Sequence, residues 1–538
     1  MKILMTMNSN TKLFLFSCFL VFQALCSVSY AGTDPIYDEF VGCLSTAGDN
    51  AISKDTVSKI VYNQENPKFT SVLDAYIRNL LFNTSETRKP TIIVTPTEEF
   101  QVPSVVLCAE KAKIQIKTRS GGHDYEGLSY VSTVPFIVLD MFNLKSIEID
   151  VAGETAWVQA GATLGELYYR ISEKSPVHGF PAGVCPTIGV GGHITGGGYG
   201  NMIRKYGLSS DHVLDARIVD VKGRILDGKA MGDDLFWAIK GGGAASFGVI
   251  LAYKIKLVPV PPKVTYFSLQ FTGEEAMDVF SKYQEVASII DNNLFIRATL
   301  KGGKNSSATE MNAIAQFLGD SNTLISITDE HFPVLGLKQE NCIEMTWIQS
   351  ILQWYGFPYT TTNPDFLLNR NPNSAVFFKR KSDYLHKPIP KQGLESLFKK
   401  LAELGSSELT LNPYGGKMGE IPAGETPFPH RAGTLFKIQY AETWMKEEAG
   451  DKYGKHLREL HSLMTPYVSS EPREAFLNYR DIELGTNDNG PRRYEEAKVY
   501  GHMYFKNNFD RLVKVKTAVD PDNFFWNEQS IPPLSAVQ

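Results

Sequence analysis

The stretch PAGVCPTIGVGGHITGGGYG, Pro181 to Gly200, places a cysteine at the head of a run rich in glycine. Glycine lacks a Cβ and tolerates positive φ, so such a run lets backbone approach a ligand closely. Two common phosphate motifs do not fit: GxxxxGK[ST] does not occur, and Gly189-Val190-Gly191 is followed by Ile194 where a dinucleotide fingerprint needs its third glycine. The stretch therefore predicts a ligand-lining turn of another kind, with Cys185 as a candidate nucleophile.

A second glycine cluster, RSGGHDYEGLSY, spans Arg119 to Tyr130 and presents His123. Two such turns can bring backbone N–H groups against a pyrophosphate and a nucleophile against an electrophilic ring. The spacing alone also allows a simpler interpretation, a hydrogen-bonded turn histidine and a small buried cysteine. Both interpretations stay open at this point.

Length and charge narrow the class of protein. A chain of 538 residues exceeds the size that one core usually serves, so at least two domains are expected. The formal net charge of -5, with mixed signs, gives no support for nucleic-acid binding. No metal site is predicted.

The first 31 residues have the pattern of a secretory signal peptide. Lys2 and Lys12 precede an apolar block from Leu13 to Leu25, and the small residues Ser29 and Ala31 follow it. A membrane anchor needs about 20 apolar residues, and this block is shorter. We therefore expect a secreted protein, extracellular or in the cell wall, with the vacuole as an alternative, and no membrane span.

Secretion permits disulfides and glycosylation. Cys18 and Cys26 leave with the signal, and four cysteines remain in the mature chain. Asn83 and Asn305 stand in glycosylation sequons.

The pattern of strands and helices predicts a mixed fold. From Lys89, a strand, a helix and a strand form a βαβ unit, with a capping box expected at Thr95 and Glu98 and another at Thr163 and Glu166. A hairpin is expected to turn at Lys222-Gly223. Beyond residue 263 the pattern indicates an antiparallel sheet with helices, hence a second domain.

Four ordered motifs carry a specific resemblance: RSGGHDYEGLSY, CPTIGVGGHITGGGYG, DLFWAIKGGGAASFGVI and NFFWNEQSIPPL. Together they resemble the plant berberine bridge enzyme-like flavoproteins, of the vanillyl-alcohol-oxidase or PCMH type of FAD fold. The resemblance implies an α+β class with an FAD-binding domain over 32–262, whose core is about 86–262. It further implies a substrate domain over 263–475, of antiparallel sheet covered by helices, and a C-terminal segment over 476–538 that returns to the FAD domain.

The resemblance also implies FAD held by two covalent bonds, from His123 to the 8α carbon and from Cys185 to C6 of the flavin ring. A disulfide between Cys43 and Cys108 is implied too, which leaves Cys342 unpaired. The further FAD-binding residues that it implies are Arg119, Ser120, Gly121, Gly122, Asp124, Gly189, Val190, Gly191, Gly192, Gly196, Gly197, Gly198, Tyr199, Gly200, Gly241, Gly242, Gly248, Val249, Asn523 and Gln529.

The candidates for catalysis in the family are Tyr125, Tyr199, Lys437, Gln439 and Tyr479. Lys437 and Gln439 lie two apart on a predicted strand and so share a face. A phenol with a pKa of about 10 is a poor base at neutral pH, but a nearby ammonium lowers that pKa. We therefore expect Tyr479 to be the base, with Lys437 lowering its pKa, while the amide of Gln439 cannot take a proton.

This set is similar to that of relatives that oxidise allylic or aromatic alcohols such as monolignols. Oxidation of a sugar at its anomeric carbon and oxidative cyclisation of a plant phenolic or alkaloid are the enzymatic alternatives. A flavin-bound non-redox cyclisation catalyst or a storage or allergen-like protein is an alternative of another class. Ile188 stands where the family has an oxygen gate, and its size favours a quinone over molecular oxygen as electron acceptor. We expect a monomer.

Overall fold

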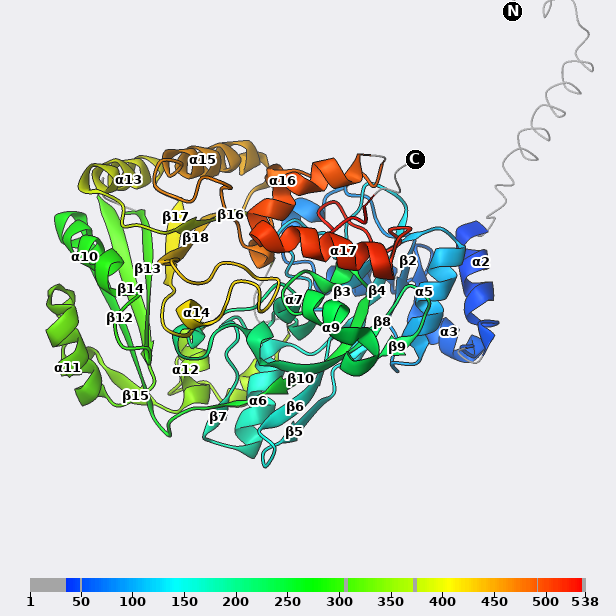
Figure 1. Cartoon of the computed structure of the whole chain (residues 1–538), viewed down its shortest axis with the longest axis horizontal. Helices are drawn as coiled ribbons and strands as arrows, with labels where there is room; N and C mark the ends of the chain where they lie inside the picture. The colour runs from blue at the N-terminus through cyan, green and yellow to red at the C-terminus, as the bar shows by residue number, and fades with distance from the viewer. Residues whose placement is uncertain (1–34, 49–50, 304–307, 371–374, 491, 535–538) are drawn as a thin grey trace, which may run out of the picture.

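The computed structural model describes residues 35–48, 51–303, 308–370, 375–490 and 492–534. Figure 1 shows a seven-stranded sheet with its helices at one end of the molecule and a four-stranded and a five-stranded sheet at the other, while β11 (Val258–Pro259) pairs with β7 (His178–Gly179) in a further, two-stranded sheet. The predicted signal peptide and the sequon at Asn305 lie outside the described residues.

The first sheet contains the predicted βαβ unit. Strands β2 (Ile92–Val94) and β3 (Gln115–Arg119) both pair parallel to β4 (Phe136–Asp140), which lies between them, and α5 (Gln101–Lys111) joins β2 to β3. All five residues of β4 are buried, as expected for a parallel strand covered on both faces. Strand β1 (Val61–Asn63) completes the sheet in the order β1-β2-β4-β3.

The capping box expected at Thr95 and Glu98 is wrong. The helix begins only at Gln101, after Phe100, and the Thr95 hydroxyl donates to the backbone oxygen of Ile60 at 3.4 Å. An S/T-x-x-E pattern marks a helix start only where the next residues turn at once, and here five residues intervene.

The second sheet follows the sequence pattern more closely. Helix α6 (Leu164–Lys174) starts at Thr163 with the predicted capping box to Glu166. The predicted hairpin joins β8 (Val213–Val219) to β9 (Ile225–Leu226). The strand order is β5 (Ile147–Asp150), β6 (Thr155–Gln159), β10 (Val249–Lys256), β8 and β9.

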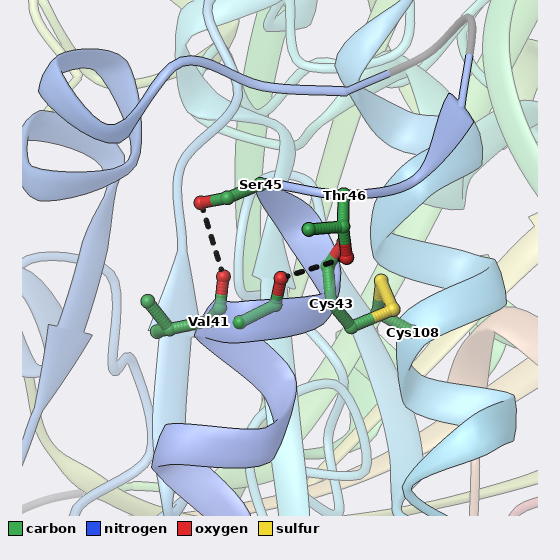
Figure 2. Close-up of a disulfide and its surroundings, with 6 residues drawn as sticks. Val41, Cys43, Ser45, Thr46 and Cys108 are labelled. Carbon is green, nitrogen blue, oxygen red and sulfur yellow. Dashed lines mark hydrogen bonds between the residues drawn. A yellow bond between two sulfur atoms is a disulfide. The ribbon is translucent and has the colours of Figure 1, made fainter.

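A disulfide joins the first described helix to the helix of the βαβ unit. Cys43 in α2 (Pro35–Leu44) is bonded to Cys108 in α5, with the two Cα atoms 5.7 Å apart (Figure 2). The predicted pairing is confirmed. The link anchors the start of the described chain beside the βαβ unit.

The third sheet is antiparallel throughout. In spatial order its strands are β15 (Ile343–Met345), β12 (Val264–Thr272), β14 (Thr309–Phe317), β13 (Leu294–Gly302), β17 (Glu408–Pro413), β18 (Phe436–Trp444) and β16 (Phe377–Leu385). Helices cover one face, with α10 (Gly273–Val286) on β12, α13 (Lys391–Leu404) on β13 and α15 (Gly450–Leu463) on β18.

Alternation along two of these strands decides where the site forms. On β13, Ile296 and Ala298 point to the helix-covered core and Arg297 to the other face. On β18, Ile438 joins the same core, so Lys437 and Gln439 share the opposite face. The uncovered face of this sheet therefore presents polar side chains to the first half of the molecule, that is, to the part that contains the first two sheets.

The C-terminal segment returns to that half. Helices α16 (Arg493–Phe505) and α17 (Phe509–Val519) lie over it in Figure 1. The buried ammonium of Lys516 donates to the backbone oxygens of Ser246 and Phe525 and to the carboxylate of Asp520. One lysine thereby fixes the last turns of the chain against residues far earlier in the sequence.

Two strands and eight α-helices remain in the described part of the chain, besides short 3-10 helices. They are β7 (His178–Gly179), β11 (Val258–Pro259), α3 (Lys54–Ile60), α4 (Phe69–Asp74), α7 (Val190–Thr195), α8 (Ile203–Tyr206), α9 (Gly228–Ala238), α11 (Ser321–His331), α12 (Trp347–Trp354) and α14 (Lys417–Glu420). Within the described ranges, each helix is too short or too polar to cross a membrane.

Candidate active site

A cavity of about 420 Å³ lies where the two halves and the C-terminal segment meet. Its wall is built from residues after β3, the glycine-rich stretch before and within α7, the loop before β10, and the segments 476–480 and 525–531. Arg297 and Gln439 reach it from the uncovered face of the third sheet.

Seventeen of the predicted site residues line this cavity: Ser120, Gly121, Gly122, His123, Asp124, Tyr125, Cys185, Ile188, Gly189, Gly191, Gly192, Tyr199, Gly242, Gly248, Gln439, Tyr479 and Gln529. The other predicted catalytic and FAD-binding residues do not line it: Arg119, Val190, Gly196, Gly197, Gly198, Gly200, Gly241, Val249, Asn523 and Lys437. Asn83, of the first sequon, lies outside the cavity, where its side-chain oxygen accepts from Lys89 at 2.8 Å.

Two of these outer residues have structural roles that the sequence did not indicate. The fully buried guanidinium of Arg119 pairs with the carboxylate of Asp140 at 2.6 Å and donates to the backbone oxygens of Val72 and Leu73. Arg119 therefore anchors the loop from behind instead of presenting its charge to a phosphate. Asn523 bonds the side chain of Asn489 and holds the C-terminal turn.

The two glycine-rich turns touch backbone to backbone. A Cβ on Gly121 would collide with the backbone of Gly189, and a Cβ on Gly189 would collide with Ser120 and Gly121. Only glycine at both positions permits this approach. The turns that carry His123 and Cys185 are thereby brought side by side.

His123 and Cys185 meet at one hydroxyl group. Thr187 Oγ1 lies 2.8 Å from His123 Nε2 and 3.5 Å from Cys185 Sγ. We call His123, Thr187 and Cys185 the His–Cys cluster. Burial, and then the charge of Arg78, lower the pKa of His123 to about 3. The imidazole is therefore neutral at physiological pH and retains a nitrogen lone pair.

The wall fits FAD in two respects. A Cβ added to Gly192 would meet no described atom within 4 Å, so this glycine leaves open space for a ring system against the backbone. Arg480 is held by Asp124 at 2.9 Å, while its Nη1, although buried, has no hydrogen-bond partner among the described residues. Such a cation suits a ligand that carries phosphate.

A second group, of aromatic, basic and amide side chains, gathers where the third sheet reaches the cavity. We call Tyr125, Tyr199, Arg297, Lys437, Gln439 and Tyr479 the tyrosine cluster. The hydroxyls of Tyr199 and Tyr479 are hydrogen-bonded to each other. Gln439 Nε2 donates to the Tyr125 hydroxyl at 2.7 Å, and the Tyr125 ring stacks on Tyr479 with centroids 5.5 Å apart.

Lys437 lies on ring faces, away from the hydroxyls. Its Nζ is 2.9 Å from the ring centroid of Tyr199, 3.8 Å from that of Phe476 and 4.8 Å from that of Tyr479. The side chain is fully buried, and its Nζ has no hydrogen-bond partner in the described part of the chain. Burial, and then the charge of Arg297, hold the pKa of Lys437 well below its ordinary value.

This arrangement corrects one expectation from the sequence. Burial raises the pKa of Tyr479 well above its ordinary value, and the neighbouring Tyr199 and Tyr125 add to the rise. The cation that opposes this rise is Arg297, and not Lys437 as expected. Burial disfavours the charged form of Lys437 as well, so the lysine does not act as a permanent cation beside Tyr479.

Arg297 is the main functional residue that the sequence reasoning missed. Its Nε donates to Asn412 at 2.8 Å, and its guanidinium lies 5.2 Å from the ring centroid of Trp354. In the sequence it is one arginine in an alternating strand, which normally indicates a solvent-facing position. Arg480 was missed as well, although it directly follows the predicted Tyr479.

Two family models match the chain. The FAD binding domain model matches residues 90–229, and the berberine and berberine-like model matches residues 475–532. Berberine bridge enzyme-like 21 of Arabidopsis thaliana is 53% identical over 528 residues, which cover 97% of either chain.

Solved structures agree with these matches. Phl p 4, a grass pollen allergen with glucose dehydrogenase activity, has a TM-score of 0.87 at 42% identity, over 92% of this chain and 99% of that one. An isoleucine-to-valine variant of Phl p 4 is described as a glucose oxidase. A cysteine-to-alanine variant of berberine bridge enzyme has a TM-score of 0.87 at 36% identity, over 92% and 100%.

These structures confirm the predicted α+β, two-domain fold. With half of its residues identical to a relative along nearly its whole length, this chain belongs to the berberine bridge enzyme-like family of FAD-dependent oxidoreductases.

Proposed function

We propose that this chain is a secreted flavoenzyme that oxidises an allylic or aromatic alcohol of the monolignol type. The observation that carries the proposal is the Tyr479 hydroxyl, which lies on the cavity wall in a hydrogen bond to Tyr199 with Arg297 close enough to favour its anion. FAD, when bound, supplies the acceptor for the hydride that leaves the carbinol carbon.

His123 and Cys185 are the residues proposed to attach the flavin at two points. Both line the cavity, both belong to turns that touch through glycine, and the neutral imidazole of His123 is a competent nucleophile. Ser120 to Asp124, Gly189, Gly191 and Gly192 form the adjoining wall. The proposed FAD-binding part spans 32–262 and 476–538, and the proposed substrate domain spans 263–475.

Tyr479 and Lys437 are proposed to hold one proton between them. Burial disfavours either charge alone, raising the pKa of the phenol and lowering that of the amine. The neutral pair and the phenolate–ammonium pair contain the same number of protons, so the pair titrates as a unit. In the second form the Tyr479 oxygen takes the hydroxyl proton of the substrate, and the Tyr199 hydroxyl donates a hydrogen bond to it.

Ile188 supports a dehydrogenase that uses a quinone in preference to oxygen. Its side chain lines the cavity, and its backbone N–H donates to the oxygen of Cys185. Because packed interiors have few voids larger than water, one methylene group is enough to fill a pocket of diatomic size. The contrast between Phl p 4 and its valine variant favours the same assignment.

The proposal that the protein is secreted rests on two features. Residues 1–31 have the pattern of a signal peptide, and Cys43 and Cys108 form a disulfide of the kind that oxidising compartments maintain.

A sugar oxidised at its anomeric carbon is the second candidate substrate, because Phl p 4 has glucose dehydrogenase activity. The test is to mix the protein under nitrogen with a monolignol, with glucose and with a short oligosaccharide, and to follow bleaching of the flavin absorbance. We expect fast bleaching by the monolignol. Bleaching by the sugars alone would establish the second candidate, and none by any alcohol or sugar would contradict both.

A further inference from the structure

We propose that Thr187 is a positioning residue that holds His123 and Cys185 in the orientation and protonation needed for attachment of the flavin. This inference rests on the attachment at His123 and Cys185 proposed above. Thr187 is 4% exposed and lies behind the cavity wall, so its hydroxyl acts through its two neighbours.

The position of the hydroxyl is fixed by the backbone on either side of it. The oxygen of Pro186 accepts from Gly165 N–H at 2.8 Å, and the oxygen of Ile188 accepts from Leu164 N–H at 2.9 Å. Both donors belong to the first turn of α6, where backbone N–H groups lack partners within the helix. A β-branched side chain on so restrained a backbone has few rotamers.

One arrangement of protons serves both neighbours. A hydroxyl has one donor and two acceptor positions, so Oγ1 can accept from Nε2–H of His123 while its own proton is donated to Cys185 Sγ. The first bond leaves the lone pair on Nδ1 of the neutral imidazole. The second stabilises negative charge on the sulfur, which is the nucleophilic form of a thiol. A single hydroxyl thereby prepares two nucleophiles.

The attachment itself is an oxidation. Each bond formed, C–N at His123 or C–S at Cys185, replaces one C–H bond of the flavin and one N–H or S–H bond of the protein. Two protons and two electrons leave for each bond, and an electron acceptor, dioxygen or a quinone, takes them up. Thr187 takes no part in this oxidation and acts only by orienting the two side chains and setting their protonation.

The test is peptide-level measurement of flavin attachment in purified holoprotein. Thr187→Val keeps the branched shape and removes the hydroxyl, whereas Thr187→Ser keeps the hydroxyl. We expect the valine variant to lose most of the flavin mass from both the His123 peptide and the Cys185 peptide, and the serine variant to retain it. In a Cys185→Ala background Thr187→Val should still reduce attachment at His123, and in a His123→Ala background it should reduce attachment at Cys185.

Thr265→Val is the matched control, because Thr265, in strand β12 of the third sheet, is also buried and its hydroxyl donates to the backbone oxygen of Gly319. It should lower the melting temperature and leave attachment complete. Full attachment at both peptides in Thr187→Val, or its loss in Thr187→Ser, would overturn the inference. If Thr187→Val binds no flavin at all, the test rests on Thr187→Ser: attachment at both peptides supports the inference, and its loss overturns it. Loss of all flavin from the wild-type protein on acid precipitation would instead contradict the proposed attachment.

Discussion

The His–Cys cluster and the tyrosine cluster face one cavity, yet their residues come from very different distances along the chain. His123 and Thr187 are 64 positions apart, and both lie in glycine-rich turns of the first half of the molecule. Tyr199 and Tyr479 are 280 positions apart, and their cluster also draws on two strands of the third sheet. The first cluster depends on local turns, whereas the second exists only when all parts of the molecule are assembled.

The electrostatics of the two clusters differ as well. In the His–Cys cluster burial removes charge, since the pKa of His123 falls to about 3. In the tyrosine cluster two basic side chains, Arg297 and Lys437, lie among three phenols, and burial disfavours the charged forms of Lys437, Tyr479 and Tyr125. The first cluster is therefore suited to nucleophiles that react once, the neutral imidazole of His123 and the sulfur of Cys185. The second is suited to a proton that moves in every turnover.

The largest effect is expected when both proposed attachment residues of the His–Cys cluster are removed. His123→Ala with Cys185→Ala should release all flavin into the supernatant on acid precipitation, because no attachment bond remains. Either single variant should keep a coloured pellet through the other bond. Cys342→Ala, which alters a cysteine outside the cavity, is the control and should retain all its flavin. A coloured pellet from the double variant would show that the flavin is attached elsewhere.

The second-largest effect is expected from a substitution in the tyrosine cluster that leaves the His–Cys cluster unchanged. Tyr479→Phe should slow anaerobic flavin reduction by about 10²- to 10⁴-fold, the usual contribution of a general base. Flavin content should not change. The measurement is stopped-flow absorbance with the best substrate of the screen. If Tyr125→Phe or Tyr199→Phe is slower still, that residue is the base.

A smaller effect tests which cation supports the phenolate. Arg297 lowers the pKa of Tyr479, so Arg297→Gln raises that pKa and moves the rise of the pH–rate profile to higher pH. At a pH below the rise, flavin reduction slows about tenfold when the profile moves up by one pH unit. Lys437→Met should move the profile in the same direction by less, because burial disfavours the charge of Lys437. If Lys437→Met moves the pH–rate profile further than Arg297→Gln does, Lys437 is the cation that supports the Tyr479 phenolate.

The smallest change concerns Ile188, which lies beside the His–Cys cluster. Ile188→Val should speed reoxidation of the reduced protein by dissolved oxygen, because the lost methylene group opens a pocket. Flavin reduction by substrate should not change, and stability should fall by about 0.5–1.5 kcal/mol, as is typical of this substitution. Stopped-flow mixing of reduced protein with aerated buffer measures the gain. Equal reoxidation rates in the two proteins would contradict the gate.

Local patterns in the sequence were reliable where neighbouring residues alone decide the structure. The capping box of Thr163 and Glu166 formed because the chain turns directly into α6. The same pattern at Thr95 and Glu98 failed, since its residues were needed to connect β2 to a helix that begins later. The hairpin at Lys222-Gly223 succeeded because β8 and β9 pair across a short turn.

Residue types and their order were sufficient to identify the two glycine-rich turns, the histidine and cysteine that they carry and, through four ordered motifs, the family. These features depend on local chemistry and on backbone that only glycine permits. Folding was needed to establish that Arg119 faces Asp140 instead of the cavity, that Arg297 is the cation near Tyr479, and that Lys437 lies on aromatic ring faces. The physical reason is that the cost of a buried charge depends on neighbours in space, and in the tyrosine cluster those neighbours are hundreds of residues away in sequence.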